Sequence, residues 1–228
     1  MAEVCGLQRV DDGLWCIGAD IRMAPGVRLP LRATIVALPA GGVAIVSPIA
    51  LDDALAAEVA NLGDVQHLIA PNCYHHLYLA AAAQRWPRAA VHLAPGLANK
   101  RPDVRHDHTL PVGLPTGLEG VHLEGAPALG EVALFHAHSR TLILTDFVFN
   151  MRNPEGAMTW LVLTVMGTHR RLAQSRLISV LVKDKAAMRR SVRTLLDLDF
   201  KRVLLAHGDI IDGADAKAQL AYALRRWC

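Results

Sequence analysis

The segment that decides the fold spans residues 65–76 and reads VQHLIAPNCYHH. Its first half, Val65 to Ala70, is a short apolar run that predicts a buried strand. Pro71 ends this run, because proline has no backbone N–H to donate to a sheet. Two adjacent histidines, His75 and His76, follow a few residues later. The segment therefore predicts a strand with metal-ligand side chains near its carboxyl end.

Two later strands end in the same way. Residues 141–145 form an apolar run followed by Asp146, and residues 202–206 form another followed by His207. Histidine and aspartate are common metal ligands, and strand ends hold side chains rigidly. We therefore expect three strands to meet at one edge of a sheet and to form a metal site there. The predicted ligands are His75, His76, Asp146 and His207.

Each of these residues also has an ordinary structural alternative. A single histidine at a strand end is more often a surface or hydrogen-bonding residue, and the pair His207-Gly208 is also typical of a turn. An aspartate that follows a strand, as Asp146 does, frequently caps the next helix. The adjacent histidine pair and the repetition of the pattern at three strand ends favour a site.

The rest of the chain alternates between strand and helix patterns. The opening residues predict a hairpin with a Gly-Gly corner, and after Asp146 the pattern is mainly helical through Leu198. Helices are expected at residues 51–62, 77–86, 185–196 and 214–227, and residues 94–119 are expected to be mostly loop. Further strands are expected at residues 14–18, 32–38, 43–46, 90–93, 121–123 and 131–136. This mixed order predicts an α/β protein whose sheets carry helices on their outer faces.

The composition limits the classes of partner. Of 228 residues, 52% are hydrophobic and 20% are charged, which is enough apolar material for a large core. We expect a single domain over residues 1–228. The net charge is only +3, and no run of Lys or Arg exceeds two residues. A nucleic-acid partner is therefore not expected.

The same sequence indicates a reducing compartment. Apolar stretches fall short of the roughly 18 residues that a membrane span needs, so no span is expected. The first 13 residues carry acids where a signal peptide would be basic and then apolar. Four cysteines are scattered without a CxxC pair, which argues against a disulfide framework or a zinc knuckle. These features predict a cytoplasmic protein.

The order of these motifs resembles the metallo-β-lactamase superfamily. It is most similar to an uncharacterised bacterial branch, a domain of unknown function, that carries PNxxHH, TLxxTD and AHG motifs. These fall on residues 71–76, 141–146 and 206–208, and the likeness extends over nearly the whole chain. The resemblance implies an αββα sandwich with the site at one edge between the two sheets.

The departures from the superfamily pattern concern its first metal site. The superfamily motif HxHxDH, aligned on His76, places its two leading histidines on Pro71 and Cys73 and its aspartate on His75. The next histidine of the superfamily falls near Pro127. Since proline side chains do not bind metals, a dinuclear centre is not expected.

The second site of the superfamily keeps usable ligands. The resemblance places it on His75, His76, Asp146 and His207, although His75 replaces an acid. This nitrogen and oxygen set suits one Zn²⁺ ion, or Fe²⁺ as the alternative. Four protein ligands are typical of a structural zinc, whereas a catalytic zinc keeps one position open. The candidates to surround the ligands are Asn72, Tyr74 and His136.

Two functions of different classes remain open. The first is a metal-dependent hydrolase of an ester, thioester or amide, in which Asp146 and His76 are the catalytic candidates. The second is a non-catalytic domain of the same fold that binds a ligand or a partner protein. A redox enzyme would need a carboxylate-rich di-iron set, which the sequence lacks. The sequence fixes neither the small-molecule substrate nor the oligomeric state.

One further apolar segment, residues 160–166, allows three interpretations. It can be a partner surface, a helix at a membrane surface, or part of the core. We expect it to belong to the core, which is where apolar segments most often lie.

Overall fold

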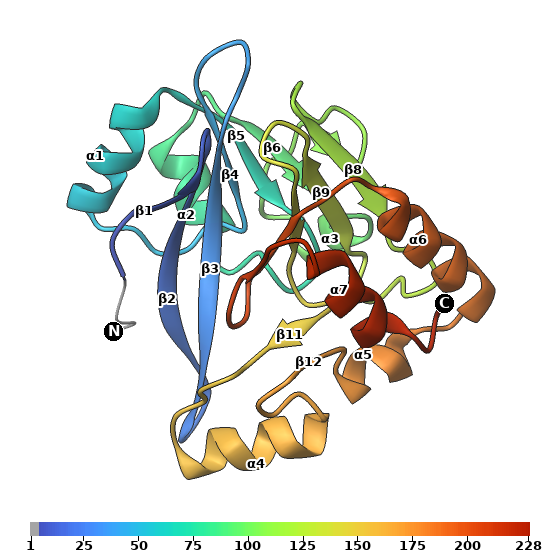
Figure 1. Cartoon of the computed structure of the whole chain (residues 1–228). Coiled ribbons are helices and arrows are strands. Elements are labelled where there is room, and N and C mark those ends of the chain that lie inside the picture. Colours follow the sequence, from blue (N-terminus) through green and yellow to red (C-terminus); the bar gives the residue numbers. More distant parts are fainter. Residues whose placement is uncertain (1–4) are drawn as a thin grey trace.

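Two β-sheets face each other in the computed structural model, which describes residues 5–228, and helices cover the outer faces (Figure 1). The first sheet has the order β1-β2-β3-β4-β5-β6-β7, and the second has the order β14-β13-β10-β9-β8. This four-layer arrangement confirms the expected αββα sandwich. The strands of the first sheet are β1 (Gln8–Asp11), β2 (Leu14–Ala24), β3 (Val27–Ala37), β4 (Val43–Val46), β5 (Val65–Ala70), β6 (Ala90–Leu93) and β7 (His108–Thr109).

The second sheet and the helices complete the layers. The remaining strands are β8 (Leu118–His122), β9 (Val132–His136), β10 (Thr141–Leu144), β13 (Arg202–Leu205) and β14 (Ile211–Asp212), with a separate pair β11 (Phe149–Asn150) and β12 (Leu172–Ala173). The helices are α1 (Asp53–Leu62), α2 (Leu79–Arg85), α3 (Leu97–Lys100), α4 (Ala157–Met166), α5 (Arg176–Leu181), α6 (Lys185–Asp197) and α7 (Ala216–Leu224). Within the first sheet β4, β5, β6 and β7 run parallel, and in the second sheet β10 and β13 do.

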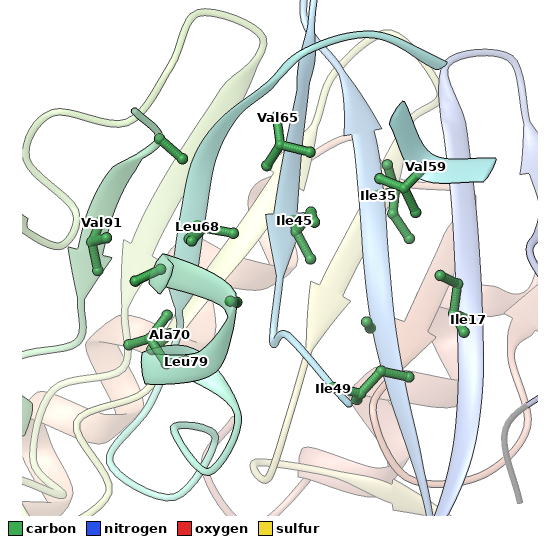
Figure 2. Close-up of a cluster of buried hydrophobic side chains, with 14 of the residues drawn as sticks. Ile17, Ile35, Ile45, Ile49, Val59, Val65, Leu68, Ala70, Leu79 and Val91 are labelled. Carbon is green, nitrogen blue, oxygen red and sulfur yellow. The ribbon is translucent and has the colours of Figure 1, made fainter. Parts of the chain in front are cut away.

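Three apolar cores hold the layers together, because the central strands are apolar on both faces. In β4, Val43 and Ile45 face the outer helices, whereas Ala44 and Val46 face the second sheet. Figure 2 shows Ile45 beside Leu68 on the helix-covered face of the first sheet. Such continuous apolar runs are typical of strands that are buried on both sides. The opposing faces of the two sheets form the middle core, which closes the sandwich.

Local signals set the ends of several helices. The Asp52 carboxylate accepts a hydrogen bond of 2.8 Å from the Leu55 backbone N–H, so α1 begins beside it. Asp184 caps α6 in the same way by accepting from the N–H groups of Ala186 and Ala187. α6 then presents one apolar face to the second sheet, as the spacing of its residues predicts.

The expected elements agree with the structure best where a strand or helix is short and uniform. Residues 43–46, 65–70 and 90–93 form strands with the predicted bounds. The expected hairpin with the Gly-Gly corner is formed by β3 and β4. The expected strands at residues 14–18 and 32–38 are longer in the structure, and β2 and β3 form a second hairpin that the sequence did not predict. The region between Asp146 and Leu198, expected to be mainly helical, also contains the short strands β11 and β12. Strands of two residues leave too little periodicity to detect.

Helix α4 corrects the expectation that residues 160–166 lie in the core. Thr159 and Leu163 are its buried residues, whereas Trp160, Leu161 and Val165 are exposed. The Thr159 hydroxyl accepts from the Arg28 N–H at 3.0 Å and donates to the Gly26 carbonyl, so the helix is attached to the tip of the β2–β3 hairpin. Figure 1 shows α4 lying across that tip, away from the helices that cover the sheets. The helix has an apolar sequence, yet much of its surface is exposed.

The helices of the described residues are all too short or too polar to cross a bilayer. Residues 1–4, part of the segment used to argue against a signal peptide, lie outside the described residues.

A buried histidine pair lies between β5, β6 and β7. The Nδ1 atom of His67 lies 2.9 Å from the Nε2 atom of His92, and the ring of His108 stacks on His92 with centroids 4.9 Å apart. His92 is fully buried. Its burial, together with the charges of His67 and His108, lowers the pKa of His92 from 6.5 to about 4.

We predict that this pair makes the protein less stable as the pH falls from 6.5 to 4. In that window the unfolded chain binds a proton at His92 and the folded chain does not, so the free energy of unfolding rises with pH. The total effect is up to about 3 kcal/mol. The His92→Gln variant, which has no group to titrate, is expected to flatten this part of the curve in urea unfolding at a series of pH values. The exposed control His106→Gln should keep the wild-type slope, and an unchanged slope in His92→Gln would contradict the assignment.

Candidate metal centre

Three strand ends meet at one edge of the sandwich. β5 belongs to the first sheet, and β10 and β13 are parallel neighbours in the second. The loop after β5 carries His75, Asp146 follows β10, and His207 follows β13. The convergence expected from the sequence is therefore present, but it joins two facing sheets and not three strands of one sheet.

The side chains of His75, Asp146 and His207 form a compact cluster. The Nε2 atom of His75 lies 3.3 Å from Asp146 Oδ2, and the Nε2 atom of His207 lies 3.2 Å from Asp146 Oδ1. The two Nε2 atoms are 3.2 Å apart. The three side chains are at most 13% exposed. They form the candidate metal-binding group of the described residues, which we call the triad.

The tautomer of His207 is set by a backbone carbonyl. Its Nδ1 lies 2.6 Å from the carbonyl oxygen of Pro30 on β3, and a carbonyl only accepts hydrogen bonds. Nδ1 therefore carries the proton, and in the neutral ring the lone pair of Nε2 points at the triad. The Phe149 ring stacks on His207 with centroids 5.1 Å apart and fixes the ring plane. Both contacts suit a histidine that binds a metal through Nε2.

Gly208 allows His207 to reach this position. The Asn150 N–H donates to the His207 carbonyl at 3.1 Å, so β11 runs beside the end of β13. A Cβ atom on Gly208 would lie 2.2 Å from the Asn150 carbonyl oxygen, and its φ of +100° is unfavourable for other residues. The glycine that follows the histidine is thus needed for close packing of two backbones.

His75 is held by a residue in a strained backbone conformation. Its Nδ1 atom lies 2.6 Å from the hydroxyl of Ser47, which directly follows β4. Ser47 has a φ of +54°, which is uncommon outside glycine and carries a cost of order 1–3 kcal/mol. The Ser47 N–H also donates to the Ile69 carbonyl, which joins the ends of β4 and β5. The contact orients the imidazole so that Nε2 faces Asp146.

Asn72 connects the loop of the first sheet to the loop of the second. Its side-chain oxygen accepts from the N–H groups of Tyr74 and His75, both at 2.8 Å, and so shapes the loop. Its amide nitrogen lies 2.8 Å from Asp146 Oδ2, 2.9 Å from Thr145 Oγ1 and 3.2 Å from Glu131 Oε2. The side chain is fully buried. Asn72 therefore has two roles, because it bonds its own loop and also orients Asp146.

Glu131 is a buried residue that the sequence reasoning did not select. It immediately precedes β9, and its Oε1 and Oε2 atoms accept from the N–H groups of Thr145 and Asp146 at 2.8 and 2.9 Å. Burial and the charge of Asp146 raise the pKa of Glu131 to about 7, although these N–H groups and Asn72 act in the opposite direction. A buried carboxyl group before a strand gives no periodic signal, so it was not recognisable from spacing.

The charge state of Asp146 is governed by its neighbours. Burial would raise the pKa of its carboxyl group, but the neighbouring imidazole rings of His75 and His207 hold that pKa well below the ordinary value of 3.8. Asp146 therefore carries a negative charge at neutral pH. That charge lies between two imidazole nitrogens, where a cation is stabilised.

His76 lies outside the triad, although the sequence placed it among the ligands. The Arg101 guanidinium donates to its Nδ1 at 2.9 Å. Burial and the charges of Lys100 and Arg101 lower the pKa of His76, which keeps the ring neutral. The neutral ring then has its one lone pair in use at Nδ1 and a proton on Nε2. Adjacent residues in this loop point in different directions, so the pair does not act together.

The two remaining candidates lie in different places. Tyr74 lines the same cavity as the three triad residues, is partly exposed, and has its ring 4.6 Å from the Lys100 ammonium group. His136 bonds Ser139 at 2.8 Å and pairs with Thr141, at the start of β10. β9 and β10 are antiparallel, so the start of β9, where Glu131 lies, meets the end of β10 at Asp146. The expectation that His136 borders the site is therefore wrong, since it lies at the opposite end of its strand.

Pro71, Cys73 and Pro127 stand where the resemblance places the first metal site, and the first two make hydrogen bonds that hold the backbone. The Pro71 carbonyl accepts from the Val132 N–H at 2.8 Å, and the Cys73 thiol donates to the Pro95 carbonyl. Burial raises the pKa of Cys73, so it stays a thiol at neutral pH. Pro127 is exposed.

The donor set and spacing of the triad fit one metal ion. Two ligand atoms on a tetrahedral zinc, each about 2.0 Å from the ion, lie about 3.3 Å from each other. In the triad the two Nε2 atoms are 3.2 Å apart, and each lies 3.2–3.3 Å from a different carboxylate oxygen of Asp146. Two imidazoles and one carboxylate also form a donor set common for catalytic Zn²⁺ and Fe²⁺. The three residues would hold such an ion through one ligand atom each.

A cavity of about 300 Å³ adjoins the triad. All three triad residues line it, together with the β2–β3 hairpin, α4, α5 and the loop before α2. Its walls are largely apolar, and examples from these elements are Ile21, Leu31, Leu163 and Ile178. A cavity of this size at a polar cluster is typical of a small-molecule site.

Comparisons with known proteins agree on the fold. The model of a domain of unknown function (DUF4336) matches residues 11–101. A metallo-β-lactamase from Pontibacter korlensis superposes with a TM-score of 0.66 at 14% identity, covering 100% of this chain and 99% of that one. The FIM-1 metallo-β-lactamase from Pseudomonas aeruginosa, in a mono-zinc form, gives a TM-score of 0.61 at 11% identity over 96% of this chain and 94% of its own.

A third solved structure belongs to another kind of protein. The Flv1 flavodiiron core from Synechocystis sp. PCC6803 gives a TM-score of 0.66 at 11% identity, with coverage of 99% of this chain and 60% of that one. No curated protein sequence matches the chain. The chain therefore has the metallo-β-lactamase fold, and its sequence matches a domain of unknown function over residues 11–101.

We predict that Glu131→Gln destabilises the protein by about 1–3 kcal/mol, because one backbone N–H then faces an amide donor and loses its acceptor. Urea unfolding at pH 8 measures this, since a carboxyl group with a pKa of about 7 is mostly ionised there. The control is Glu124→Gln, which changes an exposed carboxylate and should have little effect. Equal stability of the two variants would exclude the structural role of Glu131.

Proposed function

We propose that this chain is a metal-dependent hydrolase with one metal ion held by His75, Asp146 and His207. The observation that carries this proposal is the convergence of three potential ligand side chains, whose ligand atoms lie within 4.8 Å of one another, on the wall of a cavity. Three protein ligands with an accessible fourth position are typical of catalytic zinc. Four ligands, as expected when His76 was included, are typical of a structural ion.

The proposed substrate is a molecule with a carbonyl group activated for hydrolysis, namely an ester, a thioester or an amide. A bound Zn²⁺ or Fe²⁺ ion would supply Lewis acidity, which makes water nucleophilic near neutral pH. The chain's own residues prepare the site for this chemistry. Pro30 fixes the tautomer of His207, Ser47 orients His75, and Asn72 and Glu131 position the charged Asp146.

The similarity to a metallo-β-lactamase solved in a mono-zinc form supports a single ion. That structure shows that the fold can be occupied by one zinc in another protein. In this chain, Pro71 and Cys73 have replaced the leading histidines of the superfamily motif, which also favours one ion.

We predict that the purified protein binds about one equivalent of Zn²⁺ or Fe²⁺ and that His75→Ala and His207→Ala abolish this binding. His76→Ala is expected to keep it within about threefold, because His76 uses its lone pair on Arg101. Elemental analysis after reconstitution and dialysis measures the metal content, and circular dichroism confirms that the variants are folded. His75→Ala and His76→Ala change neighbouring residues of the same type, so His76→Ala is the matched control for His75→Ala.

Two results would contradict the metal site. One is a wild-type metal content below about a tenth of an equivalent for every divalent transition metal tested. The other is an equal loss of metal in His75→Ala and His76→Ala, which would restore the four-ligand set.

We further predict hydrolysis of 4-nitrophenyl esters or thioesters that is lost on chelation and restored by Zn²⁺ or Fe²⁺. His207→Ala is expected to lower kcat/KM at least 100-fold, because it removes a ligand of the ion. The release of 4-nitrophenolate measures the ester reaction, and the exposed variant His138→Ala serves as the control. A fully loaded protein that hydrolyses no ester, thioester or amide would favour the non-catalytic binding domain.

A further inference from the structure

The cavity beside the triad is lined mainly by apolar side chains, which does not suit a highly polar substrate. Among the described residues that line it, Asp146 is the one acidic residue, and Lys and Arg do not contribute. Five lining residues carry hydroxyl groups, and two of these are engaged elsewhere, since Ser47 contacts His75 and Ser175 accepts from the first turn of α5. The other hydroxyl groups belong to Tyr74, Tyr78 and Thr168. A ligand with several charges would lose its hydration here and gain few partners.

The apolar lining continues to the protein surface. Met23 on β2, Leu77 before α2 and Leu177 on α5 line the cavity and are also exposed, with exposed fractions of 59%, 61% and 49%. Exposed apolar side chains that border a cavity usually mark a binding site. These three residues form a rim, which gives the cavity an apolar entrance and leaves the polar triad inside it.

Helix α4 and the β2–β3 hairpin supply apolar side chains to two walls of the cavity. Helix α4 lies across the tip of the β2–β3 hairpin (Figure 1), and it contributes Val162, Leu163 and Met166 to the cavity. From the other side the hairpin contributes Leu29 and Leu31. The cavity thus lies between α4 and the hairpin, and it extends to His75, Asp146 and His207.

We propose that this cavity binds the hydrocarbon chain of an acyl substrate, so that the ester, thioester or amide carbonyl lies at the triad. This inference rests on the proposed hydrolase function and names its substrate class. In the reaction the bond between the carbonyl carbon and the oxygen, sulfur or nitrogen of the leaving group breaks. Water supplies the hydroxyl to the carbonyl carbon and a proton to the leaving group, and the products are a fatty acid and an alcohol, thiol or amine.

Binding of neutral chains tests the cavity without the metal. The probes are 1-alkanols from butanol to decanol, titrated calorimetrically into metal-free protein. Each methylene transferred from water to an apolar site is expected to lower Kd about threefold to fourfold until the cavity is filled. A Kd that does not depend on chain length would overturn the inference.

Two matched pairs of variants locate the bound chain. Val162→Trp fills the cavity and should weaken decanol binding at least tenfold, whereas Val165→Trp, on the exposed face of the same helix, should not. If Val162→Trp fails to fold, a second pair, Leu177→Glu and Val180→Glu, replaces the first. Leu177→Glu should weaken binding, and Val180→Glu, exposed on the same helix but outside the cavity, should leave it unchanged. Equal effects within both pairs would contradict the assignment.

Hydrolysis by the metal-loaded protein then separates the two proposals. For 4-nitrophenyl esters from butyrate to decanoate, kcat/KM is expected to rise with chain length and to fall in Val162→Trp. Ester hydrolysis without chain-length preference would overturn the acyl pocket and leave the hydrolase proposal standing. Length-dependent alkanol binding without hydrolysis of any ester, thioester or amide would support the pocket and overturn the hydrolase.

Discussion

The buried contact between Asn72 and Glu131 joins the two halves of the molecule. Asn72 follows a strand of the first sheet and Glu131 precedes a strand of the second, and both bond the segment that carries Asp146. A buried carboxylate is costly unless hydrogen bonds satisfy it, and here two backbone N–H groups and an amide do so. The network holds the edge of the sandwich in one arrangement, which in turn fixes the distance between the triad residues.

The triad depends on contacts made by the backbone as much as on its own side chains. The Pro30 carbonyl selects the tautomer of His207, and the strained Ser47 reaches His75 from the end of β4. Gly208 lets β11 approach the end of β13. Each contact removes freedom from a ligand before any ion binds, so the site is preorganised. The strain at Ser47 is offset by the packed sheets around it.

The cavity gives this site its chemical character. A polar cluster at the end of an apolar passage is suited to a substrate with one reactive polar group and a hydrocarbon body. Helix α4 is central to that arrangement, because it forms one wall of the cavity and the β2–β3 hairpin forms another. Its sequence resembles a core helix, yet most of its apolar residues are exposed. The cavity therefore explains why one face of the helix is apolar, whereas the apolar side chains on its other face are exposed to solvent.

The sequence by itself determined the layered fold and three strand ends of the site. Short apolar runs that stop at Pro71, Asp146 and His207 predict buried strands, because the pattern depends only on local polarity. Sequence reasoning failed where direction in space mattered. It could not show that His76 turns toward Arg101, that β9 is antiparallel to β10 so that Glu131 and not His136 meets Asp146, or that α4 packs on a hairpin tip. Those features depend on which strands and loops become neighbours, and only the packing of the two sheets decides that.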